Sequence, residues 1–276
     1  MKTRAELPGL LSAGSVLDRI VDAKRARLGA IKSSLPIEAM AERLQTAPNR
    51  LHHSLAEALE RTDRVNIIAE IKRRSPSKGI ICEDFDAARI AAGYAAAGAA
   101  AISVVCEEDF FGGSLDHLGE VREVVELPVL RKDFIIDECQ VYESAAAGAD
   151  AVLLITAILA DPLLERLLEL AQELGLDALV EVHSRDEMTR AVCAGATIIG
   201  VNNRDLTTFE VDLDASMELA ALAPRDSILV SESGITRGSD IRGLKQAGFR
   251  AFLIGEHFMR ADDPGRALHD LIGECG

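Results

Sequence analysis

The segment IIAEIKRRSPSKG, residues 67–79, begins as an apolar run and places Glu70 and Lys72 two residues apart. Side chains repeat every two residues along a β-strand, so both charges point to the same face. Burying an ionised group costs several kcal/mol unless the charge is paired. A carboxylate and an ammonium aimed together into an apolar strand therefore indicate a site at which charge is used.

Other polar residues also stand at the ends of apolar runs. Lys132 ends the run in VLRKDF, Glu181 comes late in ALVEVH, and Asn202 ends the run in IGVNNRDL. Glu232 and Ser233 close the run in LVSESG. These groups follow their apolar runs and none precedes one, which predicts a shared site at the carboxyl ends of parallel strands. A solvated rim with two or three ion pairs stays the alternative.

Two glycines give a phosphate signal. Gly234, in SESGITRG, and Gly255, in FLIGEHF, directly follow the last two apolar runs. Barrels of alternating strands and helices often bind phosphate through backbone N–H groups of these two loops, and glycine lets the backbone approach closely. Glycine is common in any loop, so the evidence for a phosphate site comes from the position of both glycines directly after the last two predicted strands.

Four segments of one form indicate how these residues are positioned: YAAAGAAAISVV, SAAAGADAVLLI, AVCAGATIIGV and KQAGFRAFLIG. In each, an alanine-rich helix end meets a glycine, which adopts the left-handed conformation that follows a helix at low cost. An apolar strand without alternation comes next, as expected for parallel strands that are covered on both faces.

Extending the pattern gives eight strand–helix units, which predict an α/β protein with a closed (β/α)8 fold, the TIM barrel. The expected strands are residues 65–71, 101–105, 129–132, 151–155, 178–183, 198–202, 228–232 and 251–254. The expected helices lie near residues 87–97, 115–125, 138–147, 162–174, 185–194, 214–222, 237–246 and 265–272. A doubly wound open sheet is the rival fold, but it usually has fewer strands and a glycine-rich first turn, where this chain has RRSPSKG.

The first sixty residues differ in character. We expect residues 1–276 to form a single domain, with an N-terminal helical extension over residues 1–62 and the barrel over residues 63–276. Residues 16–33 have the pattern of a strongly charged amphipathic helix, and short helices are expected near residues 37–44 and 55–60. Their expected role is to cover the bottom or the rim of the barrel.

Composition narrows the function. The chain has 276 residues and a net charge of −15, which argues against nucleic acid as a partner and requires local cations for any anionic ligand. Its five cysteines form no C-x-x-C pair, and it contains neither H-E-x-x-H nor a P-loop motif, so no metal is expected. No apolar run approaches a membrane span and no signal peptide is evident, so we expect a cytoplasmic protein without membrane contact.

The chain closely resembles the indole-3-glycerol phosphate synthase family of tryptophan biosynthesis. The matching blocks span nearly the whole predicted barrel: IIAEIKRRSPSKG, AISVVCEEDFFGGSL, PVLRKDFIIDECQVYES, GADAVLLI, LVEVHSRDE, IGVNNRDL, VSESGI and FLIGEHFMR. The resemblance implies conversion of 1-(2-carboxyphenylamino)-1-deoxyribulose 5-phosphate into indole-3-glycerol phosphate, carbon dioxide and water, with no cofactor. Cys106 departs from the family, which often has threonine there.

The resemblance also implies roles in proton transfer. Lys132 stands at the general-acid position, and we expect the neighbouring Lys72 and partial burial to lower its pKa toward the working range. Glu181 matches the general base of the dehydration step. Glu70 matches a further catalytic carboxylate that positions Lys72 or Lys132, and Lys72 is expected to hold an anionic group, most simply the phosphate.

The remaining positions match substrate contacts. Asn202 and Ser233 are expected to orient sugar hydroxyls, with Glu232 in the same polar network. Ser75 and Arg204 are expected at the anionic ends of the substrate. The other expected contacts are Phe111 and Phe134 at the anthranilate ring, with plain core as the alternative for Phe134, and Gly234, Gly255 and Glu256 at the phosphate. His183 has no chemistry in the match, and we interpret it as structural.

Two other functions stay open at this point. Phosphoribosylanthranilate isomerase uses a similar barrel, but it typically carries a cysteine base at the end of the first strand, where this chain has Glu70 and Lys72. A non-catalytic phosphate-binding scaffold is the second rival. A monomer is the expected state, with pairing with another enzyme of the tryptophan pathway as the alternative.

Overall fold

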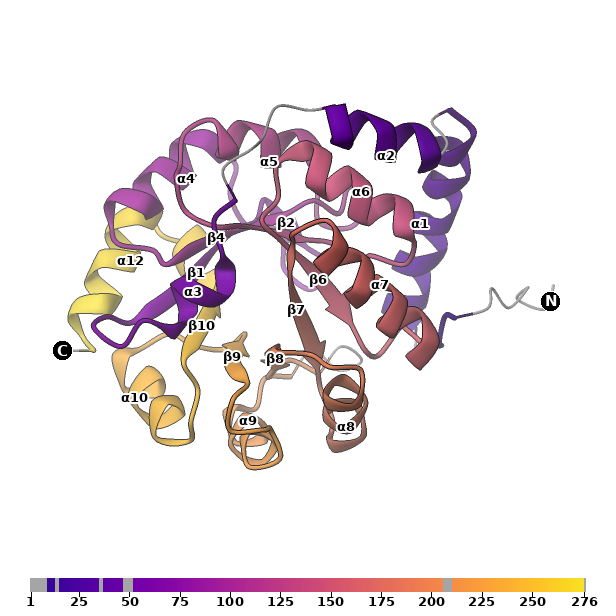
Figure 1. The fold of residues 1–276 in the computed structure, drawn as a ribbon. Helices are drawn as coiled ribbons and strands as arrows, with labels where there is room; N and C mark the ends of the chain where they lie inside the picture. The colour runs from indigo at the N-terminus through magenta and orange to yellow at the C-terminus, as the bar shows by residue number, and fades with distance from the viewer. Residues whose placement is uncertain (1–8, 13–14, 35–36, 47–51, 206–209, 276) are drawn as a thin grey trace.

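Eight parallel strands close into a barrel that is surrounded by helices. The computed structural model describes residues 9–12, 15–34, 37–46, 52–205 and 210–275. Around the barrel the strands follow the order β1-β10-β9-β8-β7-β6-β5-β4, so each strand pairs with the next barrel strand in the chain and the last pairs with the first. Figure 1 shows the ring of strands with the helices outside it. The predicted TIM barrel is confirmed.

The barrel strands are short and buried. Their bounds are β1 Asn66–Ile71, β4 Ala101–Val105, β5 Val129–Lys132, β6 Ala151–Ile155, β7 Asp177–Val182, β8 Ile198–Asn202, β9 Ile228–Glu232 and β10 Ala251–Ile254. Each agrees with the expected range to within one residue at either end. The strands do not alternate between apolar and polar because helices cover their outer face while side chains fill the interior.

Helices follow the strands at the expected places. They are α4 Ala87–Ala96, α5 Leu115–Arg122, α6 Glu138–Ala147, α7 Asp161–Glu173, α8 Arg185–Cys193, α9 Leu213–Ala220, α10 Gly238–Gln246 and α12 Pro264–Gly273. The repeated glycines at positions 98, 148, 195 and 248 all have positive φ, as the pattern required. Asp and Ser residues cap several helix starts, for example Asp86 at α4 and Ser184 at α8.

The described part of the N-terminal segment forms helices at the barrel. These are α1 Ser15–Ser34, α2 Ile37–Thr46 and α3 Leu55–Glu60. Figure 1 shows α2 beside α6 and α3 lying across the near opening of the ring. Within the described ranges, no helix combines the length and the apolar character that crossing a bilayer requires. The assignment of the whole chain to a single domain stays a prediction.

Polar residues also stand at the amino ends of some strands, where none was predicted from the sequence. Asn66, Asp150 and Asp177 stand at the amino ends of their strands, and Asn66 and Asp150 are buried. Asp177 accepts hydrogen bonds from Ser54 Oγ (3.2 Å) and Ala56 N (3.1 Å), next to α3. These residues satisfy backbone and hydroxyl groups of the segment that covers the bottom of the barrel.

Two small elements were not predicted. After β1, the strands β2 (Arg74–Ser75) and β3 (Gly79–Ile80) pair as a short antiparallel hairpin in and directly after the first turn, RRSPSKG. After β10, helix α11 (Glu256–Met259) makes a single turn. Both are too short to produce a hydrophobic period.

Candidate active site

The carboxyl ends of the strands surround one cavity of about 460 Å³. All the residues proposed for the site from the sequence line this cavity: Glu70, Lys72, Ser75, Phe111, Lys132, Phe134, Glu181, Asn202, Arg204, Glu232, Ser233, Gly234, Gly255 and Glu256. Because the strands are parallel, residues far apart in the sequence arrive at the same end of the barrel. The alternative of a dispersed, solvated rim does not fit this arrangement.

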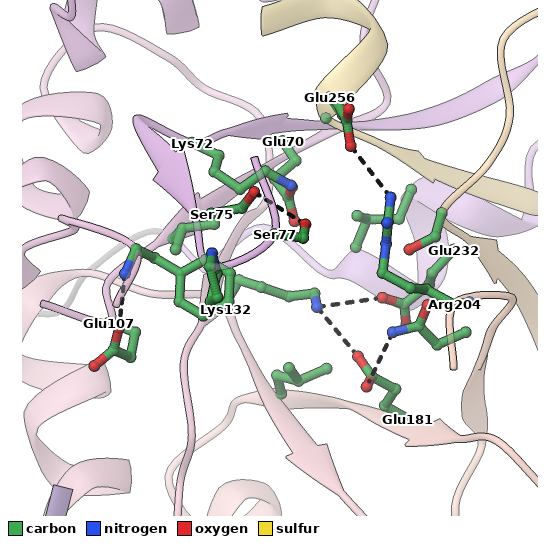
Figure 2. Close-up of a pocket in the computed structure, with 18 of the residues that line it drawn as sticks. Glu70, Lys72, Ser75, Ser77, Glu107, Lys132, Glu181, Arg204, Glu232 and Glu256 are labelled. Carbon is green, nitrogen blue, oxygen red and sulfur yellow. Dashed lines mark hydrogen bonds and ion pairs between the residues drawn. The ribbon is translucent and has the colours of Figure 1, made fainter. Parts of the chain in front are cut away.

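Lys132 reaches into the cavity from the end of β5. Its Nζ lies 3.1 Å from Glu181 Oε2 and 3.4 Å from Glu232 Oε2, and Figure 2 shows it pointing at both carboxylates. Burial opposes the charge on Lys132, but the negative charges of Glu181, Glu232 and Glu70 outweigh it and raise its pKa above the ordinary value. The expected lowering of this pKa is therefore wrong, because carboxylates from three other strands surround the ammonium.

Glu70 and Lys72 occupy the same side of the cavity, as the two-residue spacing predicted. Lys72 Nζ donates a hydrogen bond to Glu70 Oε1 (Figure 2). Burial disfavours the ionised form of Glu70, but the charges of Lys72 and Lys132 outweigh burial and lower its pKa. A Cβ on Gly255 would collide with the Glu70 carboxylate, so glycine at position 255 makes room for that side chain. This need is separate from any approach of a phosphate.

Glu181, at β7, is held by donors on both oxygens. Oε2 accepts from Lys132, and Asn202 Nδ2 lies 3.3 Å from Oε1. Burial raises the pKa of Glu181, but Lys132, His183 and the Asn202 hydrogen bond bring it below the ordinary value. His183, interpreted from the sequence as structural, places its Nε2 3.4 Å from Glu181 Oε1. The geometry keeps Glu181 as an oriented carboxylate.

Glu232, at the end of β9, has the opposite behaviour. The carboxylate is buried and neither oxygen has a hydrogen-bond partner, although Lys132 is near. Burial raises the pKa of Glu232 to about 8, and the charges of Glu181 and Glu70 act in the same direction against the opposing effect of Lys132. A Cβ on Gly200 would overlap the Glu232 carboxylate, so the glycine in β8 gives it space.

The loop after β9 has a left-handed backbone at two successive residues. Ser233 has φ 68°, the one positive φ outside glycine in the described ranges, and Gly234 follows with φ 81°. A Cβ on Gly234 would also collide with Val211. Glycine is therefore required at this position both by the positive φ and by the lack of space. Left-handed conformations at ordinary residues concentrate at functional sites, which fits Ser233 at the mouth of the barrel.

Glu256 does not offer its carboxylate to a phosphate. Its Oε2 lies 3.2 Å from Arg204 Nη2, and its Oε1 lies 3.1 Å from Arg260 Nε (Figure 2 shows the first pair). The side chain thus positions two arginines at this end of the cavity. Only the backbone of Glu256, at the start of α11, is suited to an anion.

Two aromatic rings give the cavity an apolar wall. The rings of Phe111 and Phe134 lie with centroids 6.1 Å apart, and both line the cavity. The sequence did not identify three further lining residues, Val16, Leu17 and Ile20, which come from α1 and close this side. An amphipathic pattern shows that a helix has an apolar face but not which surface receives it.

Two buried groups shape the loop after β4. Glu107, also missed by the sequence reasoning, accepts backbone N–H groups of Asp109, Phe110 and Phe111 at 2.8–3.0 Å, and so fixes the loop that carries Phe111. Cys106 donates to the carbonyl of Val104, and burial raises the pKa of its thiol to about 12. Cys106 therefore stays neutral and fills its place as a packing residue. In the described part of the chain, no three His, Cys, Asp or Glu side chains converge as a metal site would need.

Comparisons with known proteins agree with this geometry. The family model for indole-3-glycerol phosphate synthase matches residues 17–271. An indole-3-glycerol phosphate synthase of Carboxydothermus hydrogenoformans is 47% identical over 263 residues, covering 93% of this chain and 99% of that protein. One from Burkholderia ambifaria is 44% identical over 253 residues, covering 92% and 97%.

Solved structures show the same fold at low identity. 3-Hexulose-6-phosphate synthase superposes with a TM-score of 0.59 and 18% identity, covering 77% of this chain and 100% of that one. Thiamine phosphate pyrophosphorylase from Pyrococcus furiosus gives a TM-score of 0.58 at 18% identity, covering 76% and 95%. At this identity the likeness concerns the barrel alone.

Proposed function

The chain belongs to the indole-3-glycerol phosphate synthase family, and we propose that its cavity performs the family reaction with Lys132 as proton donor and Glu181 as base. The protein is a carboxy-lyase that acts on a phosphorylated small molecule. It converts 1-(2-carboxyphenylamino)-1-deoxyribulose 5-phosphate into indole-3-glycerol phosphate, carbon dioxide and water.

The reaction requires an acid at one oxygen and a base at one carbon. The ring carbon that bears the carboxylate attacks the ribulose carbonyl carbon, and the carbonyl oxygen takes a proton to become a hydroxyl. The carboxylate leaves as carbon dioxide, and its bonding electrons restore the aromatic ring. The hydroxyl then leaves as water while the neighbouring CH2 loses a proton, which completes the indole.

Lys132 fits the acid because it carries a proton in the centre of the cavity. Its contacts of 3.1 Å to Glu181 and 3.4 Å to Glu232 are the observation on which the proposal chiefly depends. The surrounding carboxylates keep the ammonium charged at neutral pH, so the donor is loaded before the substrate arrives. A developing alkoxide within reach would compete with these carboxylates for the same N–H groups.

Glu181 fits the base because its environment keeps it ionised. When Lys132 turns toward the substrate oxygen, Glu181 Oε2 loses its donor and becomes free to accept a proton, while Asn202 still holds Oε1. One movement of Lys132 would then prepare both groups. Glu70 supports this exchange by holding Lys72 on the other side of the cavity.

The anionic ends of the substrate would meet the cations of the site. For a chain of net charge −15, the cluster of Lys72, Arg204 and Arg260 gives the local attraction that an anion needs. We assign the phosphate to Lys72 and to backbone groups at Ser233, Gly234 and Gly255. Ser75 and Asn202 are assigned to polar groups of the substrate, and the wall of Phe111 and Phe134 to its aromatic ring.

Product formation by the wild-type protein tests the function. The chain contains no Trp, so indole fluorescence that grows on addition of the substrate comes from product alone. We expect this signal together with carbon dioxide release in equal amount. A flat signal from folded protein contradicts the proposal, and consumption of phosphoribosylanthranilate instead would favour the isomerase. A monomeric state and a cytoplasmic location stay predictions.

A further inference from the structure

His183 lies between two carboxylates, directly behind the proposed base. It follows the last residue of β7 and stands two positions after Glu181. Its Nε2 is 3.4 Å from Glu181 Oε1, and its Nδ1 is 3.3 Å from Glu187 Oε2 on α8. The ring therefore joins the active-site carboxylate to a second carboxylate outside the cavity.

The contacts of the ring favour its doubly protonated form. A carboxylate only accepts hydrogen bonds, and a neutral imidazole carries an N–H on one nitrogen only, so its other nitrogen would turn a lone pair toward an acceptor. Burial lowers the pKa of His183, but Glu187 and Glu181, with a smaller effect of Glu232, outweigh it and raise that pKa. Lys132 contacts Glu181 through the other carboxylate oxygen, Oε2, at 3.1 Å.

The outer side of this arrangement is fixed. Glu187 Oε2 accepts the backbone N–H of His183 at 2.8 Å and lies 3.1 Å from the hydroxyl of Thr156, which also reaches the carbonyl of Glu181 at 2.7 Å. Ser184, the N-cap of α8, accepts the backbone N–H of Glu187. Burial opposes the charge of Glu187, but its contacts with His183 lower its pKa below the ordinary value. A fixed, ionised Glu187 holds the ring in one orientation.

The ring nitrogen of His183 that faces Glu181 lacks a hydrogen bond. His183 Nε2 is buried and has no hydrogen-bond partner, although Glu181 Oε1 lies 3.4 Å away. At present Lys132 is the strongest counter-charge of Glu181. If Lys132 leaves to protonate the substrate, Glu181 loses that charge at the moment when it must act as a base. A small rotation of Glu181 would then bring it into hydrogen-bonding contact with His183 Nε2.

We propose that His183, as an imidazolium backed by Glu187, is a positioning residue that keeps Glu181 ionised and oriented after Lys132 has turned to the substrate. The inference rests on the proposed function, in which Glu181 is the base. His183 exchanges no proton with the substrate. It acts through Glu181.

The kinetic test compares His183→Gln with the wild type across pH. Gln keeps a polar side chain but removes the charge, so the pKa of Glu181 should rise and move the acid limb of the kcat profile up by about 1 pH unit. Loss of the ring should also leave Glu181 less well oriented, so we expect kcat at neutral pH to fall about 10-fold. KM should stay within about twofold, because the substrate does not touch His183. His117→Gln, the same change at a histidine that packs on Phe85, is the matched control and should leave the profile in place.

A purely structural His183 gives a different pattern. Its replacement would lower the melting temperature or the active fraction and leave the acid limb of kcat where the wild type has it. That result overturns the proposal. The melting temperatures of both variants are measured alongside, so loss of folded protein is separated from loss of turnover.

A second measurement does not depend on activity. In wild-type protein labelled with 15N and assigned sequentially, the ring nitrogens of His183 should both be protonated at pH 7. A neutral tautomer at that pH overturns the inference, whether or not His183→Gln folds. If the wild type forms no indole product, the proposed function fails by itself, and the NMR result still decides whether the charged pair exists.

Discussion

Strand β5 carries buried charges on both of its faces, and the two sets differ in how completely they are paired. Lys132 points into the barrel and belongs to the inner cluster of Glu70, Lys72, Lys132, Glu181 and Glu232. Its neighbour Arg131 and Asp133, just beyond the strand, pair with each other, and with Lys24 of α1 they form the outer cluster. Alternation along one strand thus separates two environments by a single residue.

The outer cluster satisfies its charges almost completely. Asp133 receives Lys24 Nζ at 2.8 Å, Arg131 Nη2 at 2.8 Å and the backbone N–H of Phe134 at 2.8 Å. The remaining Nη1 group of Arg131 reaches the carbonyl of Gln140 at 2.9 Å. These bonds tie α1 and α6 to the strand that carries Lys132, so the outer cluster has the features of a structural element.

The inner cluster leaves its charges incompletely paired. Three carboxyl groups share two ammonium groups, and both oxygens of Glu232 lack a hydrogen bond. Such an arrangement is less favourable for stability than the outer one, but its groups can exchange partners when a substrate enters. The contrast indicates that buried charges stabilise the fold where all of them are hydrogen-bonded. Where they are incompletely paired, they remain available to react with a substrate.

The largest expected effect on stability is at the outer cluster. Asp133→Asn leaves Lys24 and Arg131 without their shared carboxylate, and we expect the free energy of unfolding to fall by about 3–5 kcal/mol. Burial raises the pKa of Asp133, but Arg131 and Lys24 outweigh it and lower that pKa. The carboxylate therefore stabilises the fold above its unfolded pKa, and this contribution is lost as the pH falls through the folded value.

Urea denaturation of both proteins from neutral to acid pH measures this effect. The gap between wild type and Asp133→Asn should narrow as the pH falls, because the wild-type carboxylate then takes up its proton. Equal stability of the two proteins at neutral pH would remove the distinction between the clusters.

At the inner cluster, replacing a carboxyl group by an amide is expected to raise the free energy of unfolding instead of lowering it. The pKa of Glu232 is raised to about 8, so its ionisation opposes folding progressively from about pH 4, where the unfolded side chain ionises, to about pH 8. Glu232→Gln should therefore stabilise the protein increasingly over this window, reaching about 1–3 kcal/mol at its upper end. Thermal unfolding as a function of pH measures it. A destabilised variant at the upper end of the window would show that Glu232 is well paired after all.

The smallest effect is expected at the strained loop. Ser233 has φ 68°, which a side chain disfavours, so Ser233→Gly should stabilise the protein by about 0.5–1 kcal/mol. Losing one hydroxyl contact to the substrate should raise KM about fivefold. Chemical denaturation and steady-state kinetics on the same sample check both parts. A rise in stability with unchanged KM would support the backbone strain at Ser233 and contradict the proposed contact between its hydroxyl and the substrate.

The barrel itself could be predicted from the sequence in detail. Its strands are uninterrupted apolar runs and its helix ends carry glycine, so local pattern and fold agree at almost every element. The shared face of Glu70 and Lys72 followed from the two-residue period of a strand, and the place of Lys132 followed from its position at the end of an apolar run. The hairpin after β1 and the single turn of α11 were not predicted, because neither is long enough to show a period in its apolar residues.

The electrostatics could not be predicted in the same way. The sequence placed Lys72 beside Lys132 and so suggested a lowered pKa, whereas the structure surrounds Lys132 with carboxylates from three other strands. The outer cluster joins Lys24 to Asp133, 109 residues apart in the chain, and no local pattern indicates that pairing. The alternation along Arg131, Lys132 and Asp133 did indicate part of this arrangement. It predicts that Arg131 and Asp133 share one face of the strand and that Lys132 lies on the other.

Carbon dioxide release in a single turnover, measured for Lys132→Ala and Arg131→Met side by side, tests the central claim most directly. These two residues are neighbours on β5 with opposite orientations. We expect Lys132→Ala to lower the rate by at least about 10²-fold, and folded Arg131→Met to stay within about fivefold of the wild type. A rate for Lys132→Ala close to that of the wild type would contradict the account.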